Sequence, residues 1–199
     1  SCLVRGLGDV YKRQSQPENG HNPARAISKL IIDIPELTAR EDHRGIVMAT
    51  VVCVRIGEEA FGTNAGFGQL MLTIRAEFES ELDALDAEIC ARARAYARQD
   101  GITNVEIQYR DSFPETRNTP DAVAAVRKAR LECGLPEARW DEPFRSSEDF
   151  GCYTKLTSGA LFYIGCGTRH AKLHTREYDF NDEIIEPAVD MMFRLAQDA

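Results

Sequence analysis

The chain has 199 residues, which is enough for one ordinary domain or two small ones. Apolar residues make up 43% and charged residues 28%, as in typical globular proteins, and the longest apolar runs are too short to cross a bilayer. The formal net charge of −8 argues against nucleic acid as a partner, because a phosphate backbone is bound by clustered Lys and Arg. We therefore expect a globular protein that binds neither nucleic acid nor membrane.

The six cysteines form no Cys-x-x-Cys pair, and their spacing matches neither a zinc ribbon nor a disulfide framework. Scattered, unpaired cysteines are typical of proteins in a reducing compartment, and no secretory signal is visible at the start. We therefore expect a cytoplasmic protein.

The first fourteen residues differ from the rest of the chain. They carry a net charge of +2, from Arg5, Lys12 and Arg13 against Asp9, whereas the remainder is strongly acidic. The segment resembles translated adaptor sequence of the kind found at the ends of assembled environmental reads. We expect residues 1–14 to be a non-native leader that takes no part in the fold, and the alternative is a genuine, disordered N-terminus.

Residues 15–117 contain five predicted elements. Asn22 and Pro23 are typical of a helix start, and apolar residues then recur at helical spacing until Pro35, where we expect the helix to end or kink. The other four are indicated by β-branched composition, by alternation or by an apolar stripe. They are a strand at 46–56, a strand at 67–77, a helix at 79–99 and a strand at 104–113.

In chain order these elements are helix, strand, strand, helix, strand. One strand in front would complete the order β-α-β-β-α-β, a ferredoxin-like split βαβ sandwich. The missing strand would lie where the leader now sits, so the pattern implies a truncated chain. We expect residues 15–117 to form this α+β domain without its first strand.

Residues 118–199 show helices and strands in alternation, as expected for part of an α/β domain. The apolar stretch 160–166 predicts a short strand, and Ser147 predicts the start of a helix that runs to about Leu156. A further helix is predicted at 121–132 and a last one at 182–196. The inner face of the last helix is predicted to carry Ile184, Ile185, Val189, Met192 and Leu195.

The polar loop after the predicted strand at 160–166 is where such domains build their sites. His170 and His174 lie there, at a spacing that would place both on one face of a helix. Gly165 and Gly167 argue against a helix at this point. The pattern alone leaves two interpretations open, metal ligands or solvated and hydrogen-bonded histidines.

Three motifs occur in the order and spacing of the zinc-dependent amidohydrolase and exopeptidase family, which includes aminoacylases, hippurate hydrolase, auxin-conjugate hydrolases and N-acetyl-diaminopimelate deacetylase. They are SSEDFG at 146–151, ALFYIGCG at 160–167 and KLHTREYDFNDE at 172–183. The upstream PENGHNPA, followed by an apolar helix, resembles the family's inserted dimerisation domain. The chain resembles this family over residues 15–199.

The resemblance implies a site in the second region. His174 matches the family's last metal ligand, for zinc or manganese, and neutral imidazole is a good ligand for such an ion. Glu148 and Asp149 match a motif near the active site and are expected to shape it, unless they only favour a helix start. Gly165 and Gly167 are expected to let the backbone approach the metal and the substrate, or simply to form a tight turn.

The resemblance also implies a role for the inserted domain, whose polar groups reach a substrate carboxylate in the family, partly across a dimer. Asn64 is the candidate here, and the implied assembly is a homodimer through residues 15–117. The local sequence FGTNAG departs from the family's Phe-Asn-x-Ile-Pro pattern, so a simple turn asparagine is the alternative.

The implied activity is that of a metal-dependent amidohydrolase or metallopeptidase, which cleaves N-acyl amino acids or similar amides with metal-activated water. Residues 118–199 would be the C-terminal part of its α/β zinc-peptidase-like catalytic domain. The other metal ligands and the general base belong to the family's N-terminal half, and one histidine does not hold a catalytic zinc. We therefore expect this chain, as a fragment, to be inactive.

Two other interpretations stay open. The chain could be a non-catalytic dimerisation or small-ligand-binding module, and a strand formed by residues 1–14 would count in favour of it. It could also be a small metal-binding protein that uses His170 and His174 together with an acid such as Glu148.

Overall fold

The computed structural model describes residues 2–7, 20–61, 63–138, 140–168 and 170–197. The chain divides into two compact units, Ser1–Ser112 and Phe113–Ala199, which we call unit 1 and unit 2. The predicted boundary between residues 117 and 118 lies slightly further along the chain. The assignment of the two regions to a dimerisation domain and a catalytic domain stays a prediction.

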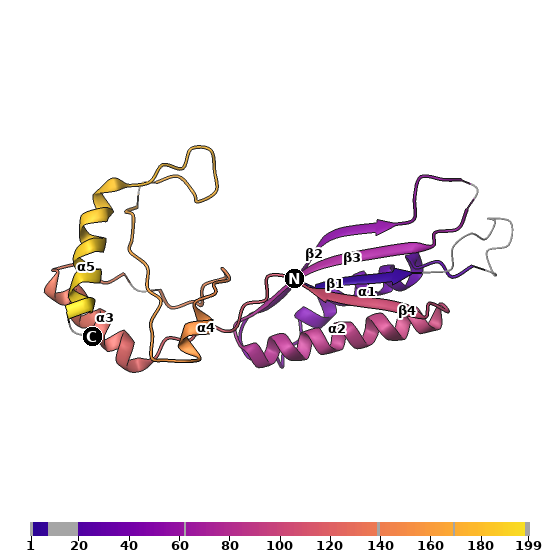
Figure 1. Ribbon diagram of the computed structural model, residues 1–199, viewed down its shortest axis with the longest axis horizontal. Helices are drawn as coiled ribbons and strands as arrows, with labels where there is room; N and C mark the ends of the chain where they lie inside the picture. The colour runs from indigo at the N-terminus through magenta and orange to yellow at the C-terminus, as the bar shows by residue number, and fades with distance from the viewer. Residues whose placement is uncertain (1, 8–19, 62, 139, 169, 198–199) are drawn as a thin grey trace. The chain divides into compact units, whose positions relative to one another are not determined.

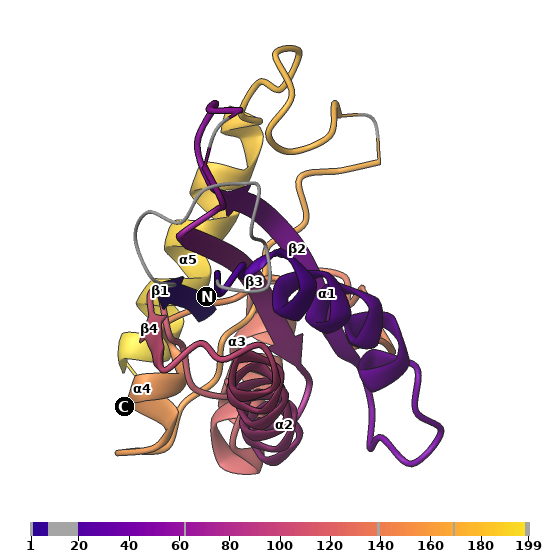
Figure 2. The same ribbon diagram turned by 90° about the vertical axis from the view of Figure 1, so that its right-hand side faces the viewer.

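Unit 1 is a four-stranded antiparallel sheet with two helices packed on one face (Figures 1 and 2). The strand order is β2-β3-β1-β4, so β2 and β4 are the edges of the sheet. The order of elements along the chain, β-α-β-β-α-β, is that of a split βαβ unit. These elements are β1 (Cys2–Leu7), α1 (Ala24–Thr38), β2 (Val47–Ile56), β3 (Phe67–Ala76), α2 (Glu79–Gln99) and β4 (Asn104–Tyr109).

The strand β1 shows that the prediction of a sheet without its first strand is wrong. Residues 2–7 pair antiparallel with both neighbours, and Val4 lies opposite Leu70 of β3 and Ile107 of β4. Without β1, the facing edges of β3 and β4 would keep unpaired N–H and C=O groups, and a strand in this gap satisfies both edges. The rest of the predicted leader, residues 1 and 8–14, lies outside the described residues.

The core of unit 1 lies between the sheet and the two helices. Leu70 and Leu72 alternate along β3 and point at the helices, and they are 0% and 1% exposed. Burial of apolar surface at roughly 25 cal/mol per Å² is the main term that holds such a layer together. The other members of the core are Ile27, Leu30, Ile34 and Leu37 of α1, Val47 of β2, and Leu85, Ile89 and Ala93 of α2.

The helix α1 continues through Pro35 to Thr38, although the sequence predicts an end or kink at the proline. Proline lacks the N–H group for one helical hydrogen bond. Ile34 and Leu37, on either side of it, are only 3% and 2% exposed, so continuing the helix buries both side chains. Burial in the tertiary structure therefore outweighs the local preference of Pro35.

Unit 2 is built from helices and irregular segments. Its elements are α3 (Pro120–Glu132), α4 (Gly151–Thr154), a 3₁₀ turn η2 (Asp182–Ile184) and α5 (Ile185–Gln197). α3 contacts α5, and Ala129 of α3 and Met191 of α5 are 1% and 3% exposed. The described residues of unit 2 form no strand, so the alternation of α and β predicted for 118–199 is not seen in them.

Three expectations for unit 2 are corrected. Residues 160–166 form no ladder, because a strand needs a neighbouring strand to pair with. The helix predicted from Ser147 is only Gly151–Thr154, which begins without a side-chain cap. The predicted inner face of the last helix is also wrong, because Val189 and Met192 are 60% and 59% exposed.

Among the residues that the structure describes, no helix is both long and apolar enough to cross a membrane.

Candidate functional site

His174 lies in the loop that leads into η2 and α5. Its backbone φ is +65°, a region that residues other than glycine rarely occupy. The turn is closed by Thr175, whose N–H and hydroxyl both donate to the carbonyl oxygen of Lys172, at 3.3 and 2.8 Å. Strained backbone of this kind clusters at functional sites, and the His174 side chain is exposed and accessible to a ligand.

His170 does not form a pair with His174 on a helix. Residues 170–181 are not helical, so the spacing of the two histidines does not place them on a common helical face. The Nδ1 atom of His170 lies 2.8 Å from the carbonyl oxygen of the adjacent Ala171. His170 is therefore an exposed histidine with a local hydrogen bond.

Glu148 and Asp149 are exposed and precede α4. The helix has no side-chain cap, and the backbone carbonyl oxygen of Asp149 accepts a hydrogen bond from the Cys152 N–H at 2.9 Å. The loop before α5 and the helix α4 lie at opposite ends of unit 2 in both views (Figures 1 and 2). The structure does not bring the two acids to the loop of His174, and their role in shaping a site stays a prediction.

Across the described ranges, no three His, Cys, Asp or Glu side chains come together in a group that could hold a metal ion. A zinc site takes three or four protein ligands, of which His174 would supply one. The described residues of this chain therefore do not fit a divalent metal ion by themselves.

The glycines of the predicted site differ in how much space surrounds them. A Cβ atom at Gly165 or Gly167 would meet nothing within 4 Å, and the φ of +96° at Gly167 accounts for glycine there through turn geometry. The close backbone approach is found at Gly151, where a Cβ would lie 2.6 Å from the oxygen of Glu115 and 2.8 Å from that of Pro114. Sequence reasoning missed Gly151, although it ends the SSEDFG motif.

Asn64 lies in unit 1, in the connection between β2 and β3, and is half-buried. Its Oδ1 atom accepts a hydrogen bond from Nδ2 of Asn22, at 3.0 Å. The Oδ1 atom of Asn22 accepts in turn from the N–H of Ala24, the first residue of α1, at 2.9 Å. Asn64 is thus tied to the start of α1, and its predicted contact with a substrate stays a prediction.

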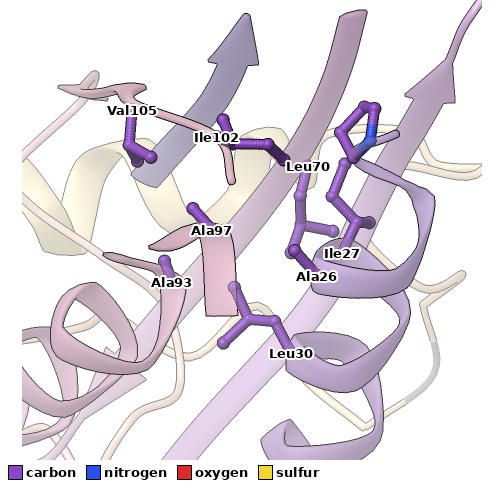
Figure 3. Close-up of a pocket in the computed structure, with 9 residues that line it drawn as sticks. Ala26, Ile27, Leu30, Leu70, Ala93, Ala97, Ile102 and Val105 are labelled. Carbon is purple, nitrogen blue, oxygen red and sulfur yellow. The ribbon is translucent and has the colours of Figure 1, made fainter. Parts of the chain in front are cut away.

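A cavity of about 30 Å³ lies between α1, α2 and β3 (Figure 3). Figure 3 shows Ile27 and Leu30 of α1 facing Ala93 and Ala97 of α2 across it. Its lining is apolar and offers a water molecule no hydrogen-bond partners. We assign it to the core and not to a binding site. Its lining consists of Pro23, Ala26, Ile27, Leu30, Leu70, Ala93, Ala97, Ile102 and Val105.

The chain is similar to known proteins along nearly its whole length. It is 24% identical over 187 residues to an uncharacterized hydrolase of Staphylococcus haemolyticus, covering 90% of this chain and 48% of that protein. Among solved structures it resembles the YxeP protein of Bacillus subtilis, described as a dinuclear metal-binding peptidase of the M20 family, with a TM-score of 0.73 and 16% identity. That match covers 98% of this chain and 48% of the other.

A third similar protein is the aminobenzoyl-glutamate utilization protein of Klebsiella pneumoniae. The TM-score is 0.74 at 18% identity, and the match covers 99% of this chain and 47% of that one. Identities this low show a shared fold. The chain spans about half the length of the relatives that it matches.

The sequence pattern of the peptidase family M20/M25/M40 matches residues 13–198, which is nearly the entire chain. The motifs around Glu148 and His174, the βαββαβ order of unit 1 and the solved relatives agree with that match. The chain belongs to the peptidase family M20/M25/M40.

Proposed function

We propose that the chain is part of a cytoplasmic hydrolase that cleaves the amide bond of N-acyl amino acids or similar small amides. The family match over residues 13–198 carries this proposal. The names of the relatives support it, because one is a hydrolase, one is a peptidase and one is named for aminobenzoyl-glutamate. In that compound an amide bond joins an aryl carboxyl group to glutamate.

The proposal includes a divalent metal ion, zinc or manganese, which would activate the attacking water. His174 is the ligand that we propose from this chain, because its imidazole is exposed and its turn is held in a strained conformation. Gly165 and Gly167 would let the backbone approach the ion and the substrate. For Glu148 and Asp149 we keep a role in shaping the site as a proposal, although the structure does not bring them to the loop of His174. Since the described residues bring no further ligands to His174, the others would come from outside them.

Unit 2 exposes large apolar side chains of a kind that globular domains usually bury. The ring of Phe144 stacks between Trp140 and Tyr163, with centroid distances of 5.4 and 4.3 Å, yet all three rings are more than half exposed. On α5, Val189 and Phe193 are each 60% exposed. Exposed apolar side chains of this kind favour contact with other polypeptide. It supports the proposal that the chain is inactive alone.

For assembly we propose a homodimer through unit 1, within residues 15–117. The edge strand β2 is ten residues long, and Val52 and Val54 are 62% and 40% exposed. A long apolar edge favours pairing with another chain. Sedimentation velocity is expected to show a dimer that Val52→Lys converts to a monomer. A monomeric parent chain would contradict the proposal.

A second candidate function is a non-catalytic dimerisation or small-ligand-binding module. The strand β1 favours it, because residues 2–7 complete the four-stranded sheet of unit 1 without a further strand. Under this alternative the chain has no hydrolase activity in any context.

A chimera separates the two candidates. In it, this chain replaces the matching half of the Staphylococcus haemolyticus hydrolase, and hydrolysis of N-acetyl and N-benzoyl amino acids is measured with added zinc or manganese. We expect turnover by the chimera, loss of that turnover with His174→Ala, and none by the chain alone. The matched control is His170→Ala, which is expected to keep the activity. Turnover by the chain alone would contradict the inactive-fragment proposal, and a folded but inactive chimera would favour the module.

A further inference from the structure

The connection between α1 and β2, residues 39–46, is fastened by the side chain of His43. Its Nδ1 atom lies 2.8 Å from Oε2 of Glu81, in the first turn of α2. Its Nε2 atom lies 2.7 Å from the carbonyl oxygen of Leu37, in the last turn of α1. The side chains of His43 and Glu81 are only 14% and 20% exposed. Both ring nitrogens therefore face an acceptor in a partly buried place.

A charged imidazole satisfies both contacts. A neutral histidine carries one N–H group and has a lone pair on the other nitrogen, so it can donate to only one of two acceptors. The imidazolium ion donates to both, and its charge is favourable at the C-terminal end of α1 and beside the Glu81 carboxylate. Hydrogen bonds to Leu37 and Glu81 and the charge of Asp42 raise the pKa of His43, although burial opposes them.

The same connection is joined to the start of α2 at two more points. The guanidinium of Arg44 lies 4.3 Å from the ring centroid of Phe78. Glu77 accepts from the N–H of Ile46 through Oε2, at 3.2 Å, and its own N–H donates to the carbonyl oxygen of Ile46, at 2.8 Å. Gly45 lies between these contacts in a bend, with a φ of +89° that glycine adopts without steric cost. Residues 43–46 and 77–81 are therefore joined by several contacts, and we call them together the corner of unit 1.

We propose that His43 is a pH-sensitive clasp, which ties the α1–β2 connection to α2 while it is protonated and releases it when it loses a proton. The groups that face it are the Glu81 carboxylate from α2, the Leu37 carbonyl from α1 and Asp42 from the connection itself. The guanidinium of Arg40 is bound to Glu88 instead. When His43 loses a proton, either the Leu37 carbonyl oxygen or the Glu81 carboxylate loses its hydrogen-bond donor. Glu81 also loses the positive charge of the imidazolium beside it.

The clasp acts on an edge of the sheet. Val47, the first residue of β2, is 9% exposed, and β2 is an edge strand whose start is held by the corner just described. Rising pH is therefore expected to loosen the start of β2 before the centre of the sheet. This inference concerns unit 1 alone and does not depend on the proposed hydrolase function.

Amide hydrogen exchange, corrected for the intrinsic effect of pH, tests the clasp on the full chain. We expect the protection of the Ile46 and Glu77 amides to fall as the pH rises above the free-histidine pKa of about 6.5 and through the raised pKa of His43. The fall should be about tenfold for each unit by which folding raises that pKa. His43→Gln should make this profile flat at the high-pH level, because glutamine stays neutral. Glu81→Gln should move the midpoint to lower pH.

Two controls keep the test sharp. His21→Gln removes the other histidine of unit 1, whose Nδ1 atom has a backbone carbonyl as its partner, and it should leave the profile unchanged. NMR titration of the His43 ring gives its pKa directly, even if a variant folds poorly. A flat profile in the parent chain, a pH response that survives His43→Gln, or a His43 pKa no higher than that of a free histidine would overturn the proposal.

Discussion

The side chain of Asn118 binds both backbone groups of Leu161. Its Nδ2 atom donates to the Leu161 carbonyl oxygen and its Oδ1 atom accepts from the Leu161 N–H, each at 2.9 Å. The neighbouring Thr119 N–H donates to the carbonyl oxygen of Gly159, also at 2.9 Å. One carboxamide thus replaces a residue of an adjacent strand, and together with Thr119 it holds the segment around Leu161 beside the start of α3.

Replacement of Asn118 by alanine is expected to free this segment. Two hydrogen bonds disappear, and at a net value of about 0.5–1.5 kcal/mol each the change should lower the stability of unit 2 by about 1–3 kcal/mol. Asn118→Asp keeps the acceptor but places a negative charge against the Leu161 carbonyl oxygen, so it should not restore stability. Urea unfolding and the exchange rate of the Leu161 amide measure both effects. An unchanged exchange rate in Asn118→Ala would contradict the role of this pair.

Asp33 is expected to make the packing of α1 on α2 sensitive to acid. Its Oδ2 atom accepts from the hydroxyl of Tyr96 and lies 2.8 Å from a nitrogen of Arg92, and its side chain is 15% exposed. Burial acts to raise the pKa of Asp33, but the hydrogen bonds from Tyr96 and Arg92 outweigh it and hold the pKa below the usual value of 3.8. The folded state thus favours the carboxylate.

A lowered pKa gives stability that is present above the unfolded value and is lost as the pH falls through the folded value. Denaturation of the parent chain between pH 2 and pH 7 should therefore show this loss below about pH 4. Asp33→Asn should lower stability at pH 7 by about 1.5–3 kcal/mol, as for a hydrogen bond to a charged group, and should remove this part of the acid loss. Tyr96→Phe, which removes one donor, should show a smaller effect. If the parent chain and Asp33→Asn lost stability equally at low pH, the role of Asp33 in the acid loss would be contradicted.

Two isoleucines give a matched test of burial. Ile89 of α2 is 0% exposed in the core of unit 1, whereas Ile185 at the start of α5 is 49% exposed. Ile89→Ala is expected to cost about 2–5 kcal/mol, because it removes buried methyl groups and leaves a cavity. Ile185→Ala should change stability by about 0.5 kcal/mol or less in the chain alone. Thermal denaturation distinguishes them, and equal losses would contradict the described core.

Two glycines give a second matched pair. A Cβ at Gly68 would lie 2.6 Å from Cδ1 of Ile27 and 2.8 Å from the ring of Pro23, so Gly68→Ala should cost about 1–3 kcal/mol through overpacking. Gly165 has open space around it, and Gly165→Ala should be tolerated in the chain alone. If Gly165 approaches a metal or substrate in the complete assembly, the same change should lower turnover of the chimera. Chemical denaturation and the hydrolysis assay check the two parts separately.

The backbone of His174 allows a test of function against stability. Glycine occupies φ of +65° without steric cost, so His174→Gly should leave stability unchanged or raise it by about 0.5–1 kcal/mol. The same change should abolish turnover by the chimera if the imidazole is a metal ligand. Loss of stability would show that the side chain has a structural role. The control is Asp111→Gly, at the other non-glycine residue described with positive φ, which should keep the activity.

Part of the candidate site follows from local sequence. The motifs around Glu148 and His174 predicted the family, and the loop position of His174 was expected from Gly165 and Gly167. Three features of the site could not be predicted from the sequence: the strained φ of His174, the hydrogen bond from Asn22 to Asn64 and the close contact at Gly151. Each depends on residues far apart in the chain or on backbone geometry.

The sequence by itself determined that unit 1 contains two helices and the strands β2, β3 and β4, although it misplaced the end of α1. The bounds of α2, Glu79–Gln99, match the prediction, because a helix satisfies its own backbone hydrogen bonds and its apolar stripe is a local pattern. Only the tertiary structure decided that residues 2–7 become a strand and that residues 160–166 do not. A strand is satisfied only by its neighbours: residues 2–7 lie between β3 and β4, whereas no described strand flanks 160–166.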